Sequence, residues 1–175
     1  MKKTRLRSKD ANKELAQYKI ALSKKDQVEL VEDDSTKNRD NNDKKDQKSI
    51  NKNNKTDIKN KLILINQLPS FFYYNDKPVP TLKYLQANLI LKKITVDMGA
   101  IKFVINGADI MRPGIKEIEE GIEKEELVVI IDENNQKPLA VGISLLSSTE
   151  MQKTTSGKVI KNIHYVGDEL WKKNL

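Results

Sequence analysis

Apolar residues recur along this chain with two different spacings, and each spacing predicts one kind of secondary structure. Between residues 8 and 22 an apolar side chain returns every third or fourth position, which places these side chains on one face of a helix. The residues on that face are Ala11, Leu15, Tyr18 and Leu22. Alternation follows, and its pattern predicts a strand over residues 26–32.

Polar residues then dominate residues 33–60, which consist almost wholly of Asp, Asn, Lys, Ser and Gln. Ile50 and Ile58 are the only large apolar side chains in this low-complexity segment. Such a composition cannot bury enough apolar surface to offset the entropy of ordering the chain. We interpret it as an insertion in a surface loop, because loops lengthen at little thermodynamic cost.

The apolar pattern returns after the insertion. Residues 61–68 form a short run that predicts a buried strand pairing with residues 26–32, and the aromatic residues 71–74 continue the sheet with at least half of them in the core. Residues 75–78 predict a turn, and Thr81 can cap a short helix. This pattern predicts an amino-terminal α/β domain over residues 1–94, joined rigidly to the next domain by almost no linker.

Residues that fix the local backbone conformation, such as a helix cap, glycines and a proline, are most frequent in residues 95–115. Asp97 is a suitable N-cap for an apolar helix over residues 98–105, which Asn106-Gly107 ends. Residues 108–111 then predict a strand that enters a type II turn at Arg112-Pro113-Gly114.

Strand patterns dominate the remainder of the chain. Residues 127–131 are continuously apolar, and residues 139–146 alternate. In the alternating strand we expect Leu139, Val141, Ile143 and Leu145 to fill a core, and Ala140, Gly142 and Ser144 to let a neighbour approach closely. A capping box at residues 147–150 predicts a helical turn, and Gly157 precedes a last strand over residues 158–166. A small barrel is the simplest arrangement of these strands.

Composition excludes most catalytic chemistry. The 175 residues include no cysteine and one histidine, so disulfides, thiolate catalysis and His/Cys metal clusters are excluded. The glycine patterns of phosphate-binding loops are missing, and capping or turn roles explain Asp97 and Asp109 at least as well as acid–base catalysis does. We predict a protein that is not an enzyme and has no cofactor or metal. Because an apolar run long enough for a membrane span or signal peptide is also missing, we expect a cytoplasmic location.

The formal net charge of +7 is unevenly distributed. Residues 1–25 hold nine Lys and Arg against two acidic residues, whereas residues 95–175 hold ten basic and thirteen acidic residues. Lysine-rich segments bind polyanions by releasing counterions, so nucleic acid is a natural partner for the amino-terminal part. The carboxy-terminal part would need local contacts instead.

The run GAIKFVINGADIMRPGI within residues 99–115 resembles the opening of a PUA domain, an RNA-binding module. It is most similar to the version in the malignant T-cell amplified sequence family and its archaeal relatives, which act in translation. The resemblance extends over roughly residues 62–175 through four further segments: Phe71-Phe72, Pro80-Thr81-Leu82, Asn162-Ile163-His164-Tyr165 and Leu170-Trp171. It implies an α+β fold, in which the amino-terminal α/β domain packs against a PUA-type pseudo-barrel of mixed strands and short helices over residues 95–175.

The resemblance also places RNA against the first helix of the PUA domain, the glycine turn, the next strand and the last strand. By position, the implied RNA-binding residues are Lys102, Asn106, Gly107, Asp109, Arg112, Lys161 and His164. Trp171 and Lys172 are added as a stacking face with an adjoining cation. A structural hydrogen bond for His164 and a barrel-capping position for Trp171 are the alternatives, and the glycines certainly also form turns.

By resemblance, the protein would act in translation without catalysis, and it would bind the acceptor region of tRNA, the small ribosomal subunit and a translation-factor protein. One alternative is an accessory subunit that presents tRNA to a modifying enzyme of the tRNA-guanine transglycosylase or pseudouridine synthase type. Another is a protein-interaction module. The insertion at residues 33–60 could likewise be an arm that samples RNA.

Replacing residues 33–60 with a short turn tests the loop interpretation. We expect the melting temperature and the RNA affinity to stay nearly unchanged, because an inserted loop contributes little to either. Thermal unfolding and filter binding of the shortened protein would measure both quantities. A collapse of either one would show that the segment does more than connect two strands.

Overall fold

The computed structural model of the chain describes residues 2–32 and 58–173. By contacts between residues, the chain divides into two compact units, Met1–Val79 and Pro80–Leu175. The domain boundary expected near residue 94 falls inside the second unit. The packing of one unit on the other stays a prediction.

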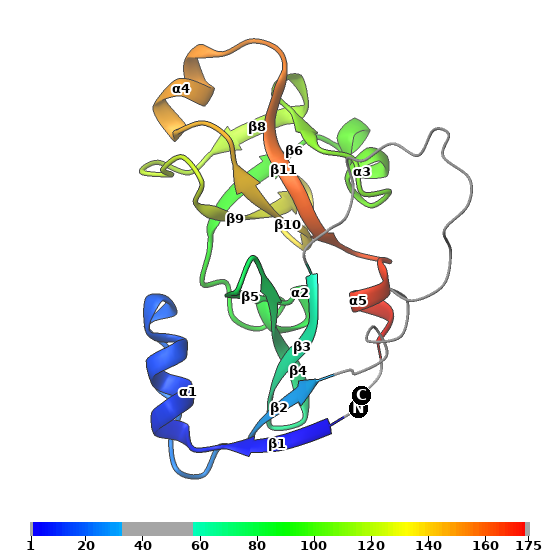
Figure 1. Cartoon of the computed structure of the whole chain (residues 1–175). Coiled ribbons are helices and arrows are strands. Elements are labelled where there is room, and N and C mark those ends of the chain that lie inside the picture. Colours follow the sequence, from blue (N-terminus) through cyan, green and yellow to red (C-terminus); the bar gives the residue numbers. More distant parts are fainter. Residues whose placement is uncertain (1, 33–57, 174–175) are drawn as a thin grey trace, which may run out of the picture. The chain divides into compact units, whose positions relative to one another are not determined.

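The first unit is built on a five-stranded sheet with the order β1-β2-β3-β4-β5 (Figure 1). The predicted pairing across the insertion is confirmed, because β2 and β3 are antiparallel, with Val28 opposite Ile65 and Leu30 opposite Ile63. The strands of this sheet are β1 (Lys2–Leu6), β2 (Val28–Glu32), β3 (Ile58–Ile65), β4 (Leu68–Tyr74) and β5 (Lys77–Pro80).

The apolar run and the aromatic run both lie in the core. Leu62 to Ile65 are all buried, as a continuously apolar strand covered on both faces should be. All four aromatic residues from Phe71 to Tyr74 are buried as well, more than the predicted half. Most of the predicted insertion, residues 33–57, lies outside the described residues. Its expected end at residue 60 was wrong, since β3 begins at Ile58.

The first helix is shorter than predicted. α1 (Ser8–Glu14) ends early and is followed by a 3-10 turn (Ala16–Tyr18), after which Lys19 adopts a left-handed φ of 54°. The Asn12 side chain explains the difference, because it donates to the Leu22 carbonyl and accepts from the Leu22 amide, holding the chain folded back. Leu22 is therefore not on the helix. Ala11 and Leu15 are fully buried, as predicted.

The second unit is organised by a six-stranded mixed sheet with the order β7-β11-β10-β9-β6-β8. β6 and β9 are parallel, whereas β6 pairs with β8 and β10 pairs with both β9 and β11 in antiparallel fashion. The strands are β6 (Lys92–Val96), β7 (Ile110–Met111), β8 (Ile115–Ile118), β9 (Leu127–Asp132), β10 (Pro138–Ser144) and β11 (Lys158–Tyr165). The helices are α2 (Leu82–Leu85), α3 (Met98–Val104), α4 (Ser148–Lys153) and α5 (Glu169–Lys172).

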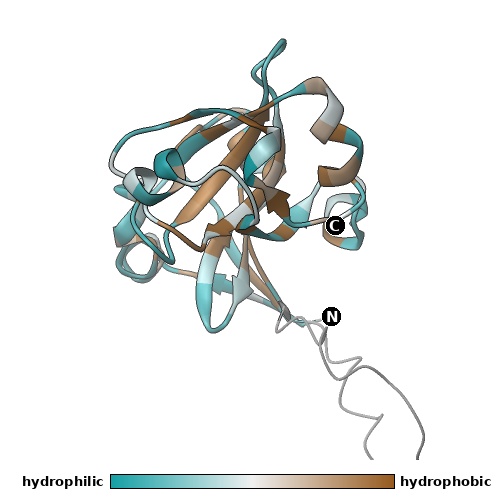
Figure 2. Ribbon diagram, turned by 90° about the horizontal axis from the view of Figure 1, so that it is seen from above, coloured by the Kyte–Doolittle hydropathy of each residue, from teal (hydrophilic) through white to brown (hydrophobic). Residues whose placement is uncertain are grey.

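The order of the strands explains why this sheet curls. β7 and β8 lie at opposite ends of the hydrogen-bonded order, yet only Arg112–Gly114 separates them in sequence. Three residues cannot cross the width of a flat six-stranded sheet, so the two edges must approach each other. The result is a half-barrel whose core includes Ile94, Val104, Ile130 and Ile160. In Figure 2 the strands carry most of the hydrophobic segments, and the turns are mainly hydrophilic.

Three caps in this unit confirm their predictions. The side chains of Thr81, Asp97 and Ser147 accept from the amides of Tyr84, Ala100 and Glu150, and Ser147 with Glu150 completes a capping box. One strand, β6, was missed. The predicted domain boundary at residue 94 cuts through it, although it pairs with β8 and β9 of the second unit.

Two local predictions were wrong. Arg112–Gly114 forms a 3-10 turn instead of a type II turn, and Gly114 is not among the glycines with positive φ. The strand expected over residues 108–111 is reduced to the two residues of β7, because only Ile110 and Met111 align with β11. Along the part of the chain that the structure describes, no helix has the length and apolar character needed to cross a membrane.

The faces of β10 were assigned incorrectly in part. Val141 is fully buried as expected, but Ala140, Gly142 and Ser144 are buried too, while Leu139 and Ile143 are only half-buried. A register shift between Val141 and Gly142 in the pairing with β11 interrupts the simple alternation. The close approach expected at Gly142 is confirmed. A Cβ there would clash with the Ile160 side chain and come within 2.9 Å of the Lys161 carbonyl oxygen.

Gly142→Ala should therefore destabilise the second unit. Overpacking against the β11 backbone is expected to lower the free energy of unfolding by about 1–3 kcal/mol. Chemical denaturation would measure the loss, with Ser156→Ala as an exposed control that should leave the midpoint unchanged. Equal stability of the glycine and alanine proteins would contradict this packing.

Candidate nucleic-acid interface

Residues 95–115 form one corner of the second unit. α3 begins at Asp97, whose carboxylate accepts from the Ala100 amide at 2.8 Å. The backbone N–H of Asp97 donates to the Gly114 carbonyl at 3.0 Å, which ties the start of the helix to the end of the 3-10 turn. The Cα of Gly114 faces Ala100 so closely that a Cβ there would lie 3.0 Å from the Ala100 methyl group. The helix and the turn are therefore in direct contact.

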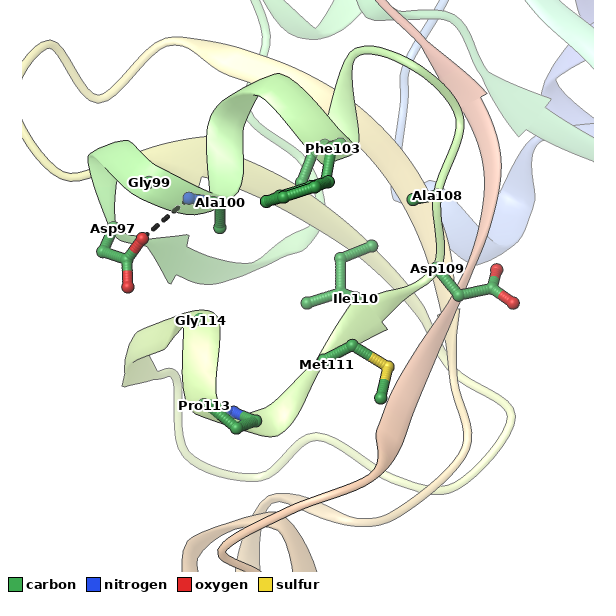
Figure 3. A pocket seen from close by; sticks show the side chains of 11 residues that line it. Asp97, Gly99, Ala100, Phe103, Ala108, Asp109, Ile110, Met111, Pro113 and Gly114 are labelled. Carbon is green, nitrogen blue, oxygen red and sulfur yellow. Dashed lines mark hydrogen bonds between the residues drawn. The ribbon is translucent and has the colours of Figure 1, made fainter.

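Between α3, β7 and the 3-10 turn lies a pocket of about 420 Å³ (Figure 3). Its volume is within the range of small-ligand sites. Apart from two aspartates, the lining side chains are apolar or absent. The lining residues are Asp97, Gly99, Ala100, Phe103, Val104, Ala108, Asp109, Ile110, Met111, Pro113 and Gly114.

Exposed apolar side chains lie in the lining of this pocket, at Phe103 and Met111, and next to it in sequence, at Met98. Phe103 is 58% exposed, and Met98 and Met111 are each 50% exposed. Among the described residues, six large hydrophobic side chains are at least 38% exposed, and four of these six belong to residues 98–111. A surface cluster of exposed apolar side chains is typical of a site that contacts another molecule.

The predicted cation and amide at the end of α3 lie on the surface. Lys102 is exposed, and its Nζ lies 4.9 Å from the centroid of the Phe103 ring. Asn106 is exposed too, and its side chain donates to the Lys102 carbonyl at 2.8 Å. These residues therefore place one positive charge beside the exposed aromatic ring.

Gly107 and Asp109 have structural roles as well. Gly107 has a φ of 82°, and a Cβ there would lie 2.7 Å from the Tyr165 ring, so both conformation and space require glycine. Asp109 accepts from the Asn162 amide at 2.9 Å and pairs with Lys158 at 3.0 Å. Both of its carboxylate oxygens are therefore engaged.

Asn162 holds the same loop from the other side, and sequence reasoning gave it no role. Its side-chain nitrogen donates to the carbonyls of Val104 and Ala108, at 3.0 and 3.1 Å. Together, Asn162 and Asp109 fasten the loop between α3 and β7 to β11. The loop forms one wall of the pocket, so this clamp sets the shape of the pocket.

Arg112 does not project freely from the surface. Its Nε donates to the Met151 carbonyl at 2.7 Å, and its Nη1 donates to the Ile115 carbonyl at 3.2 Å. The side chain is half-buried and joins the end of α4 to the start of β8. Arg112 therefore has a structural role, whether or not it also contacts RNA.

His164 is buried, with 1% of its surface exposed. Its Nε2 accepts from the Leu82 amide at 3.2 Å, so Nδ1 carries the proton that is donated to Asp168 at 2.7 Å. Burial would raise the pKa of Asp168, but bonds from His164 and from the amides of Trp171 and Tyr165 hold that pKa below its ordinary value. The structural alternative for His164 is the one that this geometry supports.

Of the nine predicted residues, Asp109 alone is in the lining of this pocket. Lys161 and Lys172 are exposed, and Trp171 is half-buried in α5, whose first turn is capped by Asp168. Among the described residues there is also no group of three or more acidic or histidine side chains that could hold a metal ion. Of the nine predicted residues, the structure brings Lys102, Asn106, Gly107, Asp109 and Arg112 to one corner.

Sequence reasoning missed the apolar members of the site, Phe103, Met111 and Pro113. One signal was available. The helix at residues 98–105 is apolar at almost every position, which is more than one buried face of a short helix can use. The surplus apolar residues must face solvent or a partner.

The profile of the PUA domain family matches residues 92–166, the part of the chain that forms the curled mixed sheet and the corner of α3 and the 3-10 turn. The chain is 50% identical to an uncharacterized protein of Methanocaldococcus jannaschii over 111 residues, 63% of this chain and 68% of that protein. The chain therefore belongs to the PUA-domain family that includes this archaeal protein and the malignant T-cell-amplified sequence proteins.

Two eukaryotic relatives illustrate the family. Translation machinery-associated protein 20 of Schizosaccharomyces pombe is 36% identical over 58% of this chain and 59% of its own length. Malignant T-cell-amplified sequence 1 of Danio rerio is 36% identical over 63% of this chain and 64% of its own length. The chain thus matches less than two thirds of either relative. A crystal structure of a hypothetical protein from Pyrococcus horikoshii is similar over 98% of both chains, with a TM-score of 0.72 and 30% identity.

The two roles possible for Arg112 can be separated by substitution. Arg112→Lys keeps the positive charge but cannot reproduce two hydrogen bonds from a planar fork. Because the carbonyls of Met151 and Ile115 each lose the hydrogen bond from Arg112, we expect both Arg112→Lys and Arg112→Ala to lower the free energy of unfolding by about 1–3 kcal/mol. Denaturation curves would measure this loss. Full stability of Arg112→Lys, combined with weakened RNA binding by Arg112→Ala alone, would instead assign the side chain to phosphate contact.

Proposed function

We propose that the protein binds RNA through the corner formed by α3, β7 and the 3-10 turn, and that it acts by binding and catalyses no reaction. The pocket with exposed Phe103 beside Lys102 is the observation that carries this proposal. Membership of the PUA family supports the class of ligand, because this domain is an RNA-binding module.

The chemistry of the pocket favours an unpaired base over a phosphate. Asp97 and Asp109 lie in its lining, and their negative charges repel phosphate. A base has no net charge, and it can stack on an exposed aromatic ring and fill an apolar cavity. Lys102, next to the Phe103 ring, is placed to hold a phosphate outside the pocket.

The names of the relatives support a role in translation, since two of the matched proteins are translation machinery-associated protein 20 of yeasts. We propose the acceptor region of tRNA, with its unpaired end, as the RNA, and the small ribosomal subunit as the site of action. Asn106, Gly107 and Asp109 shape the loop beside the pocket and Arg112 supports the corner, while Lys161, Trp171 and Lys172 are proposed as peripheral contacts at most. We also propose a translation-factor protein as a binding partner.

Phe103→Ala and Met111→Ala test the pocket directly. Because both side chains are at least half exposed, we expect little change in stability, whereas loss of base stacking at Phe103 should weaken tRNA binding by about 5- to 150-fold. The log–log salt slope should stay the same, because apolar contacts release no counterions. Fluorescence titration of tRNA at several salt concentrations would measure both quantities.

Matched controls make the test specific. Leu89→Ala removes an apolar side chain that is 50% exposed but lies outside the pocket, and it should bind tRNA normally. Lys102→Ala should lower the salt slope by roughly 0.7 to 0.9, the contribution of one phosphate contact. If Phe103→Ala binds tRNA as tightly as the unchanged protein, the pocket is not the RNA site. Co-sedimentation with small ribosomal subunits would test the role in translation separately.

A further inference from the structure

A basic surface lies on the first unit, carried by β1 and α1. Its six cations, all exposed, are Lys2, Lys3, Arg5, Arg7, Lys9 and Lys13. In the described part of the chain, none of the six forms an ion pair. The proposed pocket uses none of these residues.

The fold explains why these cations face solvent. β1 is an edge strand that pairs only with β2, and four of its five side chains are exposed (Figure 1). In α1, Lys9 and Lys13 are four residues apart and share a helix face. Ala11 and Leu15 are buried on the opposite side, so the lysines point away from the core.

Two of the six charges are partly compensated within the sheet. Lys2 lies opposite Glu32 and Arg5 lies opposite Glu29 in the β1–β2 register. Lys3 lies opposite the apolar Val31, and Arg7, Lys9 and Lys13 lie beyond the strand. The acidic residue nearest the end of α1, Glu14, accepts from the Tyr73 hydroxyl and is engaged with the core. Asp10, exposed on α1, lies three residues from both Arg7 and Lys13 but forms no ion pair with either. The six cations thus outnumber the three carboxylates near them, which are Asp10, Glu29 and Glu32.

Protection of the sheet edge accounts for only part of this pattern. Lysines on an edge strand prevent unwanted pairing with another sheet, which explains Lys2 and Lys3. It does not explain Arg7, Lys9 and Lys13, which no strand pairing would involve. A protein interface would need an apolar anchor, whereas the large apolar side chain of β1, Leu6, is half-covered.

We propose that this basic surface is a second RNA contact, which binds the phosphate backbone without reading sequence. Closely spaced cations that outnumber the nearby carboxylates and form no ion pairs gain affinity for a polyanion by releasing its counterions. This contact would make the protein grip RNA at two places with different chemistry: a base in the pocket of the second unit, and phosphates on the first unit. The proposal does not depend on the pocket.

A blunt-ended RNA duplex separates the two contacts, since its bases are paired and cannot enter the pocket. The test variant of the full chain replaces Lys3, Arg7, Lys9 and Lys13 with Gln. We expect it to bind the duplex far more weakly, with a log–log salt slope smaller by about 3 to 4 for four lost contacts. Phe103→Ala should bind the same duplex as well as the unchanged protein does, so failure of the pocket and failure of the basic surface give different results.

The matched control replaces four exposed lysines of the second unit with Gln and lowers the net charge equally: Lys116, Lys124, Lys137 and Lys153. It should keep nearly all of the duplex affinity. An equal loss in the control would reduce the effect to net charge, and an unchanged slope in the test variant would remove the surface from RNA binding. Self-association of a test variant that still binds RNA would assign the cations to edge protection. The double variant Lys9→Gln/Lys13→Gln leaves β1 intact and should lower the slope by about 2.

Discussion

The link between β7 and β8 is the constraint on which the second unit depends. These strands lie at opposite ends of the sheet order, but only Arg112–Gly114 separates them. The sheet must curl to satisfy this connection, and the half-barrel core follows from the curl. Arg112 secures the link by bonding to carbonyls of α4 and β8, and the Asp97 amide secures it by bonding to Gly114. The candidate site lies at this corner because the closure brings α3 against the turn.

The same closure leaves apolar groups on the surface. A helix as short as α3 can bury only a few side chains, and Val104 is its one fully buried residue. Phe103 and Met98 therefore remain exposed beside a pocket whose loop is clamped by Asn162 and Asp109. A pocket wall that is held by these hydrogen bonds, beside an exposed aromatic ring, suits the binding of a flat, uncharged group such as an unpaired base. Of the two predicted cations at this corner, Arg112 is bonded to backbone carbonyls and Lys102 lies beside the Phe103 ring, so the corner offers little charge for binding phosphates.

The distribution of charge differs between the two units, and the proposed RNA contacts differ with it. In residues 95–175 the acidic side chains outnumber the basic ones, so shape and stacking would have to supply most of the affinity of the proposed contact there. The first unit carries the exposed cations of the basic surface on β1 and α1. Phosphate contacts act at a distance and depend on salt, whereas stacking is short-ranged and does not. Binding by both routes would combine fast, unspecific encounter with local recognition of an unpaired base.

Local signals in the sequence determined the elements whose cause is local. Thr81, Asp97 and Ser147 cap helices as predicted, because capping depends on a few neighbouring residues. The apolar run predicted as a strand over residues 61–68 is buried only as far as Ile65, where β3 ends before the turn that leads to Leu68. The family resemblance placed most of the candidate site residues within residues 99–115. Only the tertiary structure decided that α1 stops at Glu14, that β6 belongs to the second unit, that Arg112 holds the corner and that Phe103 faces solvent. Each of these depends on contacts between residues far apart in the chain, and spacing along the sequence does not record such contacts.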